Sequence, residues 1–126
     1  MRKINKIIVH CSDSDIEAHQ DISVIDYWHR ERGFAMVGYH YFITWDGTIQ
    51  KGRDLERVGA HCVGQNADSI GICLGGRHKF TKVQFTTLKA LLFDLITRFN
   101  LRTTDVYPHN HFDKNKTCPN FDLDKI

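Results

Sequence analysis

Two histidines and a cysteine near the end of the chain are residue types that bind metal ions. They lie in the segment HNHFDKNKTC, residues 109–118, as His109, His111 and Cys118. A catalytic zinc ion binds imidazole nitrogen and thiolate sulfur through three protein ligands, with its fourth position open to water or substrate. The eight residues between His109 and Cys118 are enough for a loop to bring both side chains to one ion. The composition suits a zinc site, but an ordinary polar surface loop has the same composition.

A third ligand is available at the end of an expected strand. The segment KIIVHCS, residues 6–12, has a continuous apolar run typical of a buried strand, and His10 follows that run. Two histidines and one cysteine are enough for an open catalytic site, whereas a closed structural site needs four ligands and usually paired C-x-x-C motifs, which the sequence lacks. A blue-copper site would add a methionine. Met1 and Met36 both lie far from residues 109–118 in sequence, which argues against copper.

The other histidines and cysteines have simpler interpretations. Buried thiols commonly behave as small hydrophobic side chains, and this is the interpretation of the cysteines in or beside apolar segments, namely Cys11, Cys62 and Cys73. Histidines in polar or charged stretches are commonly exposed, and we expect this of His19, His29 and His78. Any single histidine is more often exposed or hydrogen-bonded than bound to a metal.

The apolar pattern predicts the elements that position these residues. Strands are expected at 6–12 and 69–76 because their apolar residues are continuous. A helix is expected between Ser23, followed three residues later by Asp26, and Gly33. Residues 39–52 predict a β-hairpin that turns at Asp46 and Gly47, with Tyr39 at its start.

A second helix and an irregular C-terminal segment complete the predicted domain. Thr81 and Gln84 have the spacing of a capping box, and the residues that follow form a wide apolar face as far as Phe99. From Asn100 onward the periodicity is lost, so no regular element is expected there. The alternation of strands and helices predicts one α/β domain.

Length and charge restrict the possible partners. With 126 residues, 41% of them hydrophobic and 25% charged, the chain can bury one core. The net charge of +2 comes from scattered residues, so nucleic acid is not an expected partner. No apolar stretch approaches the roughly 18 residues of a membrane span, and the start MRKINKIIVHC has too short an apolar run for a secretion signal. We expect a monomer, made in the cytoplasm, with no membrane partner.

Five segments, taken in order, resemble the zinc-dependent N-acetylmuramoyl-L-alanine amidases, the family that includes phage T7 lysozyme and the peptidoglycan recognition proteins. The segments are IIVHCSDS, YWHRERGF, VGYHYFITWDGTIQKGRD, VGAHCVGQNADSIGICLGG and HNHFDKNKTCPNFDL. They extend from about Ile7 to Leu123, and five ordered segments are far more specific than any one of them. The chain is similar to a short, phage-type member of this family.

The resemblance implies a ligand set for one Zn²⁺ ion, consisting of His10, His109 and Cys118. Asn110 and Phe112 keep their family positions after the first tail histidine, which favours His109 over His111 as the ligand. His111 stands where close relatives have a glutamate. We expect it either to support the ligands or to face the substrate.

The resemblance also implies roles for three other residues. Tyr39 and Lys116 match residues that assist catalysis, and His61 matches a histidine that lines the substrate groove. Zinc lowers the pKa of its bound water to about 7, and Lys116 would stabilise the negative charge that develops on the carbonyl oxygen. Tyr39 would orient the water or that charge. Without the resemblance, Lys116 would be interpreted as a solvated surface lysine and Tyr39 as an ordinary strand residue.

The implied fold is a single amidase domain, residues 1–126, in which helices flank a central mixed β-sheet and zinc lies in a groove at one sheet face. The implied reaction is hydrolysis of the amide between N-acetylmuramic acid and L-alanine in peptidoglycan. The enzyme would reach the cell wall after phage-type release, or it would be a bacterial enzyme that is released by another route or acts on recycled fragments. The main alternative is a peptidoglycan-binding module without catalysis, as in recognition proteins that lack the cysteine ligand. A regulatory role in binding a polymerase has no support in the residues.

Overall fold

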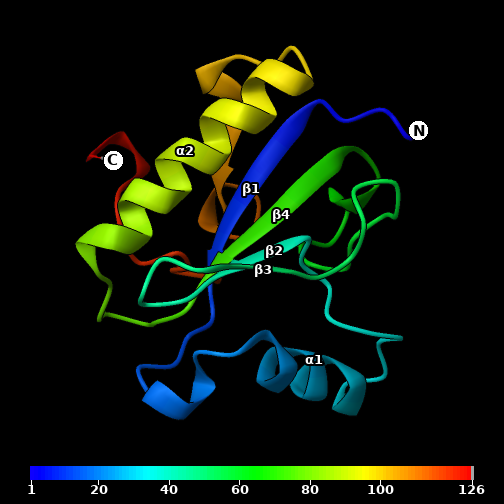
Figure 1. Ribbon diagram of the computed structural model, residues 1–126. Helices are drawn as coiled ribbons and strands as arrows, with labels where there is room; N and C mark the ends of the chain where they lie inside the picture. Colours follow the sequence, from blue (N-terminus) through cyan, green and yellow to red (C-terminus); the bar gives the residue numbers. More distant parts are fainter. Residues whose placement is uncertain (126) are drawn as a thin grey trace.

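The computed structural model describes residues 1–125, and a five-stranded mixed sheet lies at its centre (Figure 1). The strand order is β3-β2-β4-β1-β5. Strand β1 pairs in parallel with β4 and β5, β2 pairs in parallel with β4, and β3 is antiparallel to β2. The strands are β1 (Lys6–Cys11), β2 (Tyr41–Ile43), β3 (Ile49–Lys51), β4 (Ser69–Leu74) and β5 (Val106–Pro108).

Two helices cover opposite faces of this sheet, α1 (Ile22–Glu31) and α2 (Lys82–Arg98) (Figure 1). Short 3₁₀ turns occur at Glu17–His19, Asn66–Asp68, Thr103–Asp105, His109–His111 and Leu123–Lys125. The predicted fold, a single domain with a mixed sheet flanked by helices, is confirmed. None of the described helices is long and apolar enough to cross a membrane.

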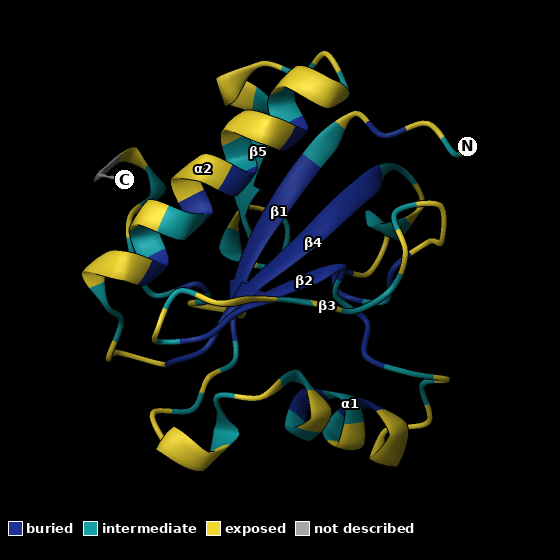
Figure 2. Cartoon of the chain, in the orientation of Figure 1, coloured by how far each residue is buried: buried dark blue, intermediate teal, exposed yellow. Residues whose placement is uncertain are grey.

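The larger core lies between the sheet and α2, and Figure 2 shows the buried strands β1 and β4 beside this helix. Side chains alternate between the two faces of a strand, so every second residue of each strand points toward α2. The residues of this core that are essentially inaccessible to solvent include Ile7, Val9, Ile43, Ile70, Ile72, Leu74, Leu88 and Leu95. Burial of such side chains, each contributing about 1.5–3 kcal/mol, is the main stabilising term of this layer.

The start of α2 is fixed to the sheet by its predicted capping box. The backbone N–H of Gln84 donates to the Thr81 hydroxyl over 3.2 Å, and the Thr81 N–H donates to Gln84 Oε1 over 2.9 Å. The buried Gln84 amide also donates to the carbonyls of Ile43 and Gly75, at 3.1 and 2.9 Å. The capping box therefore also fixes the helix to the ends of β2 and β4.

The opposite face of the sheet has a smaller apolar cluster beneath α1, made of Ile25, Val37, Phe42 and Cys73. Strand β1 directs His10 to this face, since its neighbours Val9 and Ile7 point toward α2. In the parallel pairing, His10 lies beside Cys73 of β4. This face therefore combines apolar residues with a histidine.

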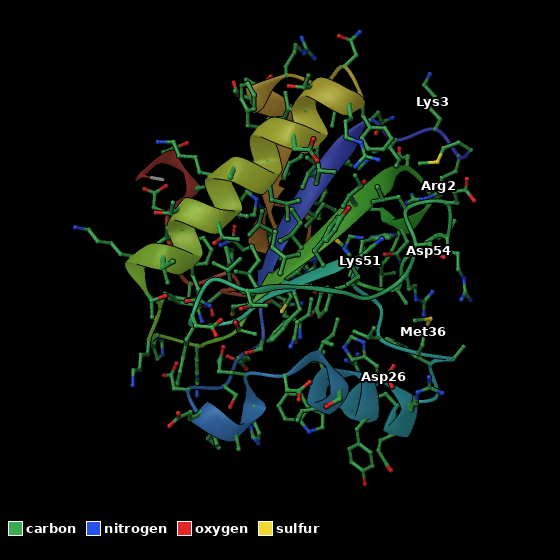
Figure 3. All side chains as sticks on the ribbon, in the orientation of Figure 1. Arg2, Lys3, Asp26, Met36, Lys51 and Asp54 are labelled. Carbon is green, nitrogen blue, oxygen red and sulfur yellow. The ribbon has the colours of Figure 1, made fainter. Side chains whose placement is uncertain are left out.

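Helix α1 begins earlier than predicted. Its N-cap is Asp21, whose carboxylate accepts the Ser23 N–H over 2.9 Å, so the expectation that Ser23 starts the helix was wrong. Asp26, which was expected to complete a capping box with Ser23, accepts the Val37 N–H over 2.7 Å instead. That bond fixes the loop containing Met36 to the helix (Figure 3).

The C-terminal segment is more regular than predicted, because Val106–Pro108 forms β5 on the free edge of β1. Three residues are too few to show a periodicity of two, and a proline is tolerated at a sheet edge. Val9 pairs with Pro108. His109 therefore follows the strand immediately and lies next to His10.

Candidate metal centre

The structure brings together the three residues expected to bind zinc. One potential ligand atom each from His10, His109 and Cys118 lies within 4.8 Å of the others. His10 comes from β1, His109 from the turn after β5, and Cys118 from the end of the loop that follows. The His10 and His109 ring centroids are 4.3 Å apart, and the Asn110 N–H donates to the Cys118 carbonyl over 3.0 Å, which closes the loop.

His10 Nδ1 is a buried nitrogen with no hydrogen-bond partner among residues 1–125. The His10 side chain is 1% exposed, and its other nitrogen, Nε2, lies 2.8 Å from His61 Nδ1. A buried polar atom without a partner costs about 1–3 kcal/mol, so native structures rarely retain one without a reason. A metal ion is a suitable partner, and two imidazoles with one thiolate are ligands that zinc prefers. These residues fit a zinc ion.

The two histidine ligands have the charge state that metal binding requires, whereas the cysteine reaches it only with a cation present. Burial, together with the neighbouring histidines, holds the pKa of His10 well below its usual value, and burial lowers the pKa of His109. Both rings are therefore neutral at pH 7, as metal binding requires. The adjacent Cys11 thiol and burial raise the pKa of Cys118. A cation is needed to stabilise that thiolate.

Three further histidines are buried around the candidate ligands, and the sequence analysis predicted none of them to be buried. They are His29, His40 and His61, which are 6%, 0% and 9% exposed. The expectation that His29 is exposed was wrong, since its Nδ1 accepts the Gly38 N–H over 2.8 Å. The charged neighbours of His29 led to the expectation of exposure. The spacing to Ile25 could have predicted burial, because His29 follows this buried residue by one helical turn and so shares its face.

The ring of His61 fits against the backbone of two glycines. A Cβ added at Gly71, in the middle of β4, would lie 2.6 Å from the ring, and one at Gly59 would lie 2.7 Å from it. A glycine inside a strand often marks such a close approach. His61 is thus held edge-on to His10, with the two ring planes at 87°.

Tyr39 lies beside His10, with ring centroids 5.0 Å apart. Desolvation is the main reason that the pKa of Tyr39 is raised well above its usual value, and its hydroxyl adjoins the Cys73 thiol. The hydroxyl is therefore protonated at neutral pH and can donate a hydrogen bond. Lys116 is exposed on the 109–118 loop, where its N–H donates to the Asp113 carbonyl over 3.0 Å.

A cavity of about 1040 Å³ opens between α1 and the 109–118 loop. Tyr39, His61, His109, Lys116 and Cys118 are among the residues that line it, so the structure brings most of the expected site residues to one cavity. The cavity wall also carries charged side chains of both signs, namely Asp13, Arg32, Arg77 and Asp113.

Among the described residues, two expected site residues do not line this cavity: His10, which is buried but lies against His109 in the cavity wall, and His111. His111 is exposed, and its ring packs against Tyr107 and Phe112 with centroid distances of 4.9 Å to each.

Comparisons with known proteins all lead to one family. The profile of the family described as N-acetylmuramoyl-L-alanine amidase matches residues 1–121. The endolysin of Escherichia phage T7 is 38% identical over 125 residues, covering 93% of this chain and 81% of the endolysin. The endolysin of Klebsiella phage KP32 is 36% identical over 130 residues, covering 97% of this chain and 84% of that endolysin. The solved structure of the N-acetylmuramoyl-L-alanine amidase LysC from Clostridium intestinale matches with a TM-score of 0.89 at 32% identity, covering 98% of this chain and 83% of LysC.

Proposed function

This chain belongs to the N-acetylmuramoyl-L-alanine amidase family and is a peptidoglycan-degrading amidase, and we propose that His10, His109 and Cys118 hold one Zn²⁺ ion at its active site. The observation that carries the proposal is the convergence of three ligand atoms within 4.8 Å, one of them the unpartnered His10 Nδ1. Bound zinc supplies a hydroxide-like nucleophile at neutral pH and polarises the substrate carbonyl. The cavity beside the proposed zinc site has a volume of about 1040 Å³ and would receive the sugar together with its attached stem peptide.

Lys116 is the group that we assign to charge stabilisation. The attack on an amide builds negative charge on the carbonyl oxygen, and a positioned cation stabilises that charge more strongly once substrate has displaced water from the cavity. Lys116 contributes to the cavity wall beside Cys118. Its ammonium group would therefore lie near the scissile carbonyl when the sugar and peptide fill the cavity.

Tyr39 is assigned to orienting the attacking water. Its hydroxyl remains protonated because desolvation raises its pKa, so it acts as a hydrogen-bond donor rather than as a base. Its ring lies against that of His10, which places it next to the ligands. Contacts of His61 and His111 with substrate stay predictions.

The site of action follows from the substrate. Peptidoglycan is outside the cytoplasmic membrane, and the similarity to phage endolysins supports action on the cell wall after phage-type release. We propose that the enzyme works as a monomer, without nucleic-acid or membrane partners.

The test combines metal analysis with identification of the products. Purified protein should contain one zinc per chain, and its digest of peptidoglycan should contain peptides that begin with free L-alanine and glycans with a free lactyl carboxylate. A chelator should abolish the release of these peptides from peptidoglycan, and addition of one equivalent of zinc should restore it. Binding to the cell wall without release of peptides, in zinc-loaded protein, would instead favour a binding module. A metal content near zero with full activity would exclude the zinc proposal.

A further inference from the structure

Three hydrogen bonds connect the ring of His10 to a backbone carbonyl. His10 Nε2 lies 2.8 Å from His61 Nδ1, and His61 Nε2 lies 3.1 Å from the Ser69 hydroxyl. That hydroxyl donates to the Gln65 carbonyl over 2.6 Å. All three side chains are buried, with Ser69 fully inaccessible. We call this series, from His10 through His61 and Ser69 to the Gln65 carbonyl, the hydrogen-bond relay.

The direction of each hydrogen bond in the relay follows from its last member. A carbonyl oxygen can only accept, so the single Ser69 proton points at Gln65. Ser69 must then accept from His61, which places a proton on His61 Nε2. A neutral imidazole carries only one N–H, so His61 Nδ1 accepts and His10 Nε2 donates. His10 Nδ1 is consequently left with a free lone pair.

The opposite direction would leave two polar groups without partners. If His61 Nδ1 donated to His10 Nε2, the neutral His10 ring would carry its proton on Nδ1, which is buried and has no acceptor among the described residues. Ser69 would then donate to His61, and its oxygen would lie 2.6 Å from the Gln65 carbonyl with no proton between them. Both arrangements keep the two rings neutral.

The geometry of the relay is fixed by the loop that carries it. Asn66 Oδ1 accepts the backbone N–H groups of His61 and Cys62, both over 2.9 Å. The Gln65 N–H donates to the Cys62 carbonyl over 3.0 Å, which closes a turn and orients the Gln65 carbonyl. The His61 ring cannot move toward β4 without contacting the backbone at Gly71.

We propose that Ser69 and His61 are positioning residues that set the tautomer of His10, so that Nδ1 is the nitrogen offered to the metal. The proposal rests on the zinc site proposed above and adds to it a residue, Ser69, that the family resemblance did not suggest. It also gives His61 a role through His10, in addition to its predicted contact with the substrate. Partners that orient a metal-bound histidine typically contribute about 10–100-fold to metal affinity.

The first test is the tautomer itself, measured by ¹⁵N NMR of the full-length protein labelled at histidine, before and after addition of one equivalent of zinc. His10 and His61 should both carry their proton on Nε2 before zinc is added. Addition of zinc should perturb His10 Nδ1 and leave its Nε2 protonated. A proton on His10 Nδ1 in the unsubstituted protein would overturn the proposal, and this result requires no variant to fold.

The second test is zinc affinity, measured by competition with a chelator. Ser69→Ala and His61→Ala should weaken zinc binding about 10–100-fold. His61→Asn should lose less zinc affinity than His61→Ala, because the amide oxygen of asparagine can replace Nδ1 as the acceptor. Thr87→Ala is the matched control, because the Thr87 hydroxyl also donates to a backbone carbonyl, that of Gly47 at 2.9 Å, but not in the relay.

The outcomes separate this proposal from the zinc site. Unchanged zinc affinity in Ser69→Ala and His61→Ala, with a wild-type protein that binds zinc and cleaves peptidoglycan, would overturn the relay alone. A wild-type protein that binds no zinc would overturn the zinc site. The tautomers of His10 and His61 would still decide whether the relay has the direction proposed.

Discussion

The central strands β1, β2 and β4 are buried on both faces of the sheet, yet the two faces differ in chemistry. Toward α2, the strand residues that form the core are branched aliphatic or aromatic side chains, such as Ile7 and Val9. Toward α1, the intervening positions include His10 and Gly71. Burial therefore does not distinguish the core from the active site in this protein. The kind of side chain that is buried does.

Polar residues on the α1 face are retained because almost all of their polar atoms have partners. His29 accepts a hydrogen bond from Gly38, and His40 accepts one from Gly71, at 2.8 and 3.0 Å. Each of these bonds offsets part of the cost of removing an imidazole from water. Among the histidine nitrogens of the described residues, His10 Nδ1 is the buried one without a partner. That exception marks the position that we propose for the metal.

Removal of a ligand should have the largest effect on activity. His10→Ala and Cys118→Ser should each reduce release of stem peptides to the level of chelator-treated protein, because the remaining two ligands cannot hold a catalytic zinc. Product release is measured by mass spectrometry, and zinc content by atomic emission. The fold should persist, since the α2 face is untouched, and circular dichroism checks this.

His111→Ala is the control for these two variants. It removes a histidine from the same segment, but the ring packs outside the cavity, so zinc content should remain at one per chain. Loss of zinc in His111→Ala together with retention in the ligand variants would show that the wrong tail residues were assigned.

A substitution on the α2 face should show the opposite pattern. Leu88 is fully buried between α2 and the sheet, so Leu88→Ala should reduce the free energy of unfolding by about 3 kcal/mol through lost burial and a residual cavity. Zinc affinity at 25 °C should not change in the folded protein. Urea denaturation measures the first quantity and chelator competition the second. The exposed Phe93 of the same helix provides the control Phe93→Ala, with a change within about 0.5 kcal/mol.

The α2 face was also the part of the molecule that could be predicted from sequence alone. Continuous apolar runs indicated β1 and β4, a wide apolar face indicated α2, and Thr81 with Gln84 marked the start of the helix correctly. These signals are local, because neighbouring residues in sequence carry them. Strand β5 was missed, since three residues at a sheet edge depend on pairing with β1 rather than on their own pattern.

The candidate site was only partly predictable for the same reason. The ligand types in residues 109–118 were visible, but the choice among them came from a family resemblance. The buried state of His61 depends on its fit against glycine backbone in the folded chain, such as Gly71 beneath its ring. The hydrophobic pattern of the sequence does not predict such a contact. Hydrogen-bond partners, and hence tautomers, can be read only from the fold.

Lys116 should matter for rate and not for the metal. Lys116→Ala should lower kcat about 10²-fold, in the range seen when one group that stabilises an oxyanion is removed, while zinc content stays at one per chain. Steady-state kinetics on a soluble muropeptide measure the rate. Lys114→Ala removes the same charge from an exposed position in the same loop that does not line the cavity. An equal loss in both variants would show that only the net charge of the loop matters.

The smallest expected effect concerns the pH dependence of stability on the α1 face. Desolvation, with Arg32 and Arg53 nearby and Asp26 opposing them, lowers the pKa of His29 to about 4. The unfolded chain, with a histidine pKa near 6.5, binds this proton first as the pH falls. The stabilisation from His29 is therefore complete above about pH 6.5 and decreases as the pH falls toward 4, by roughly 1 kcal/mol per pH unit.

His29→Asn isolates that contribution, because its amide oxygen can accept the Gly38 N–H but does not titrate. Urea denaturation of both proteins between pH 7 and 4.5, in the presence of a chelator, should give a steeper loss of stability for the wild type. Carboxylates that do not interact with His29 titrate equally in both proteins and cancel in the difference, so the difference reports His29 together with its neighbour Asp26. Parallel curves would mean that His29 is protonated in the folded protein, and the α1 face would then tolerate a buried charge where the α2 face has none.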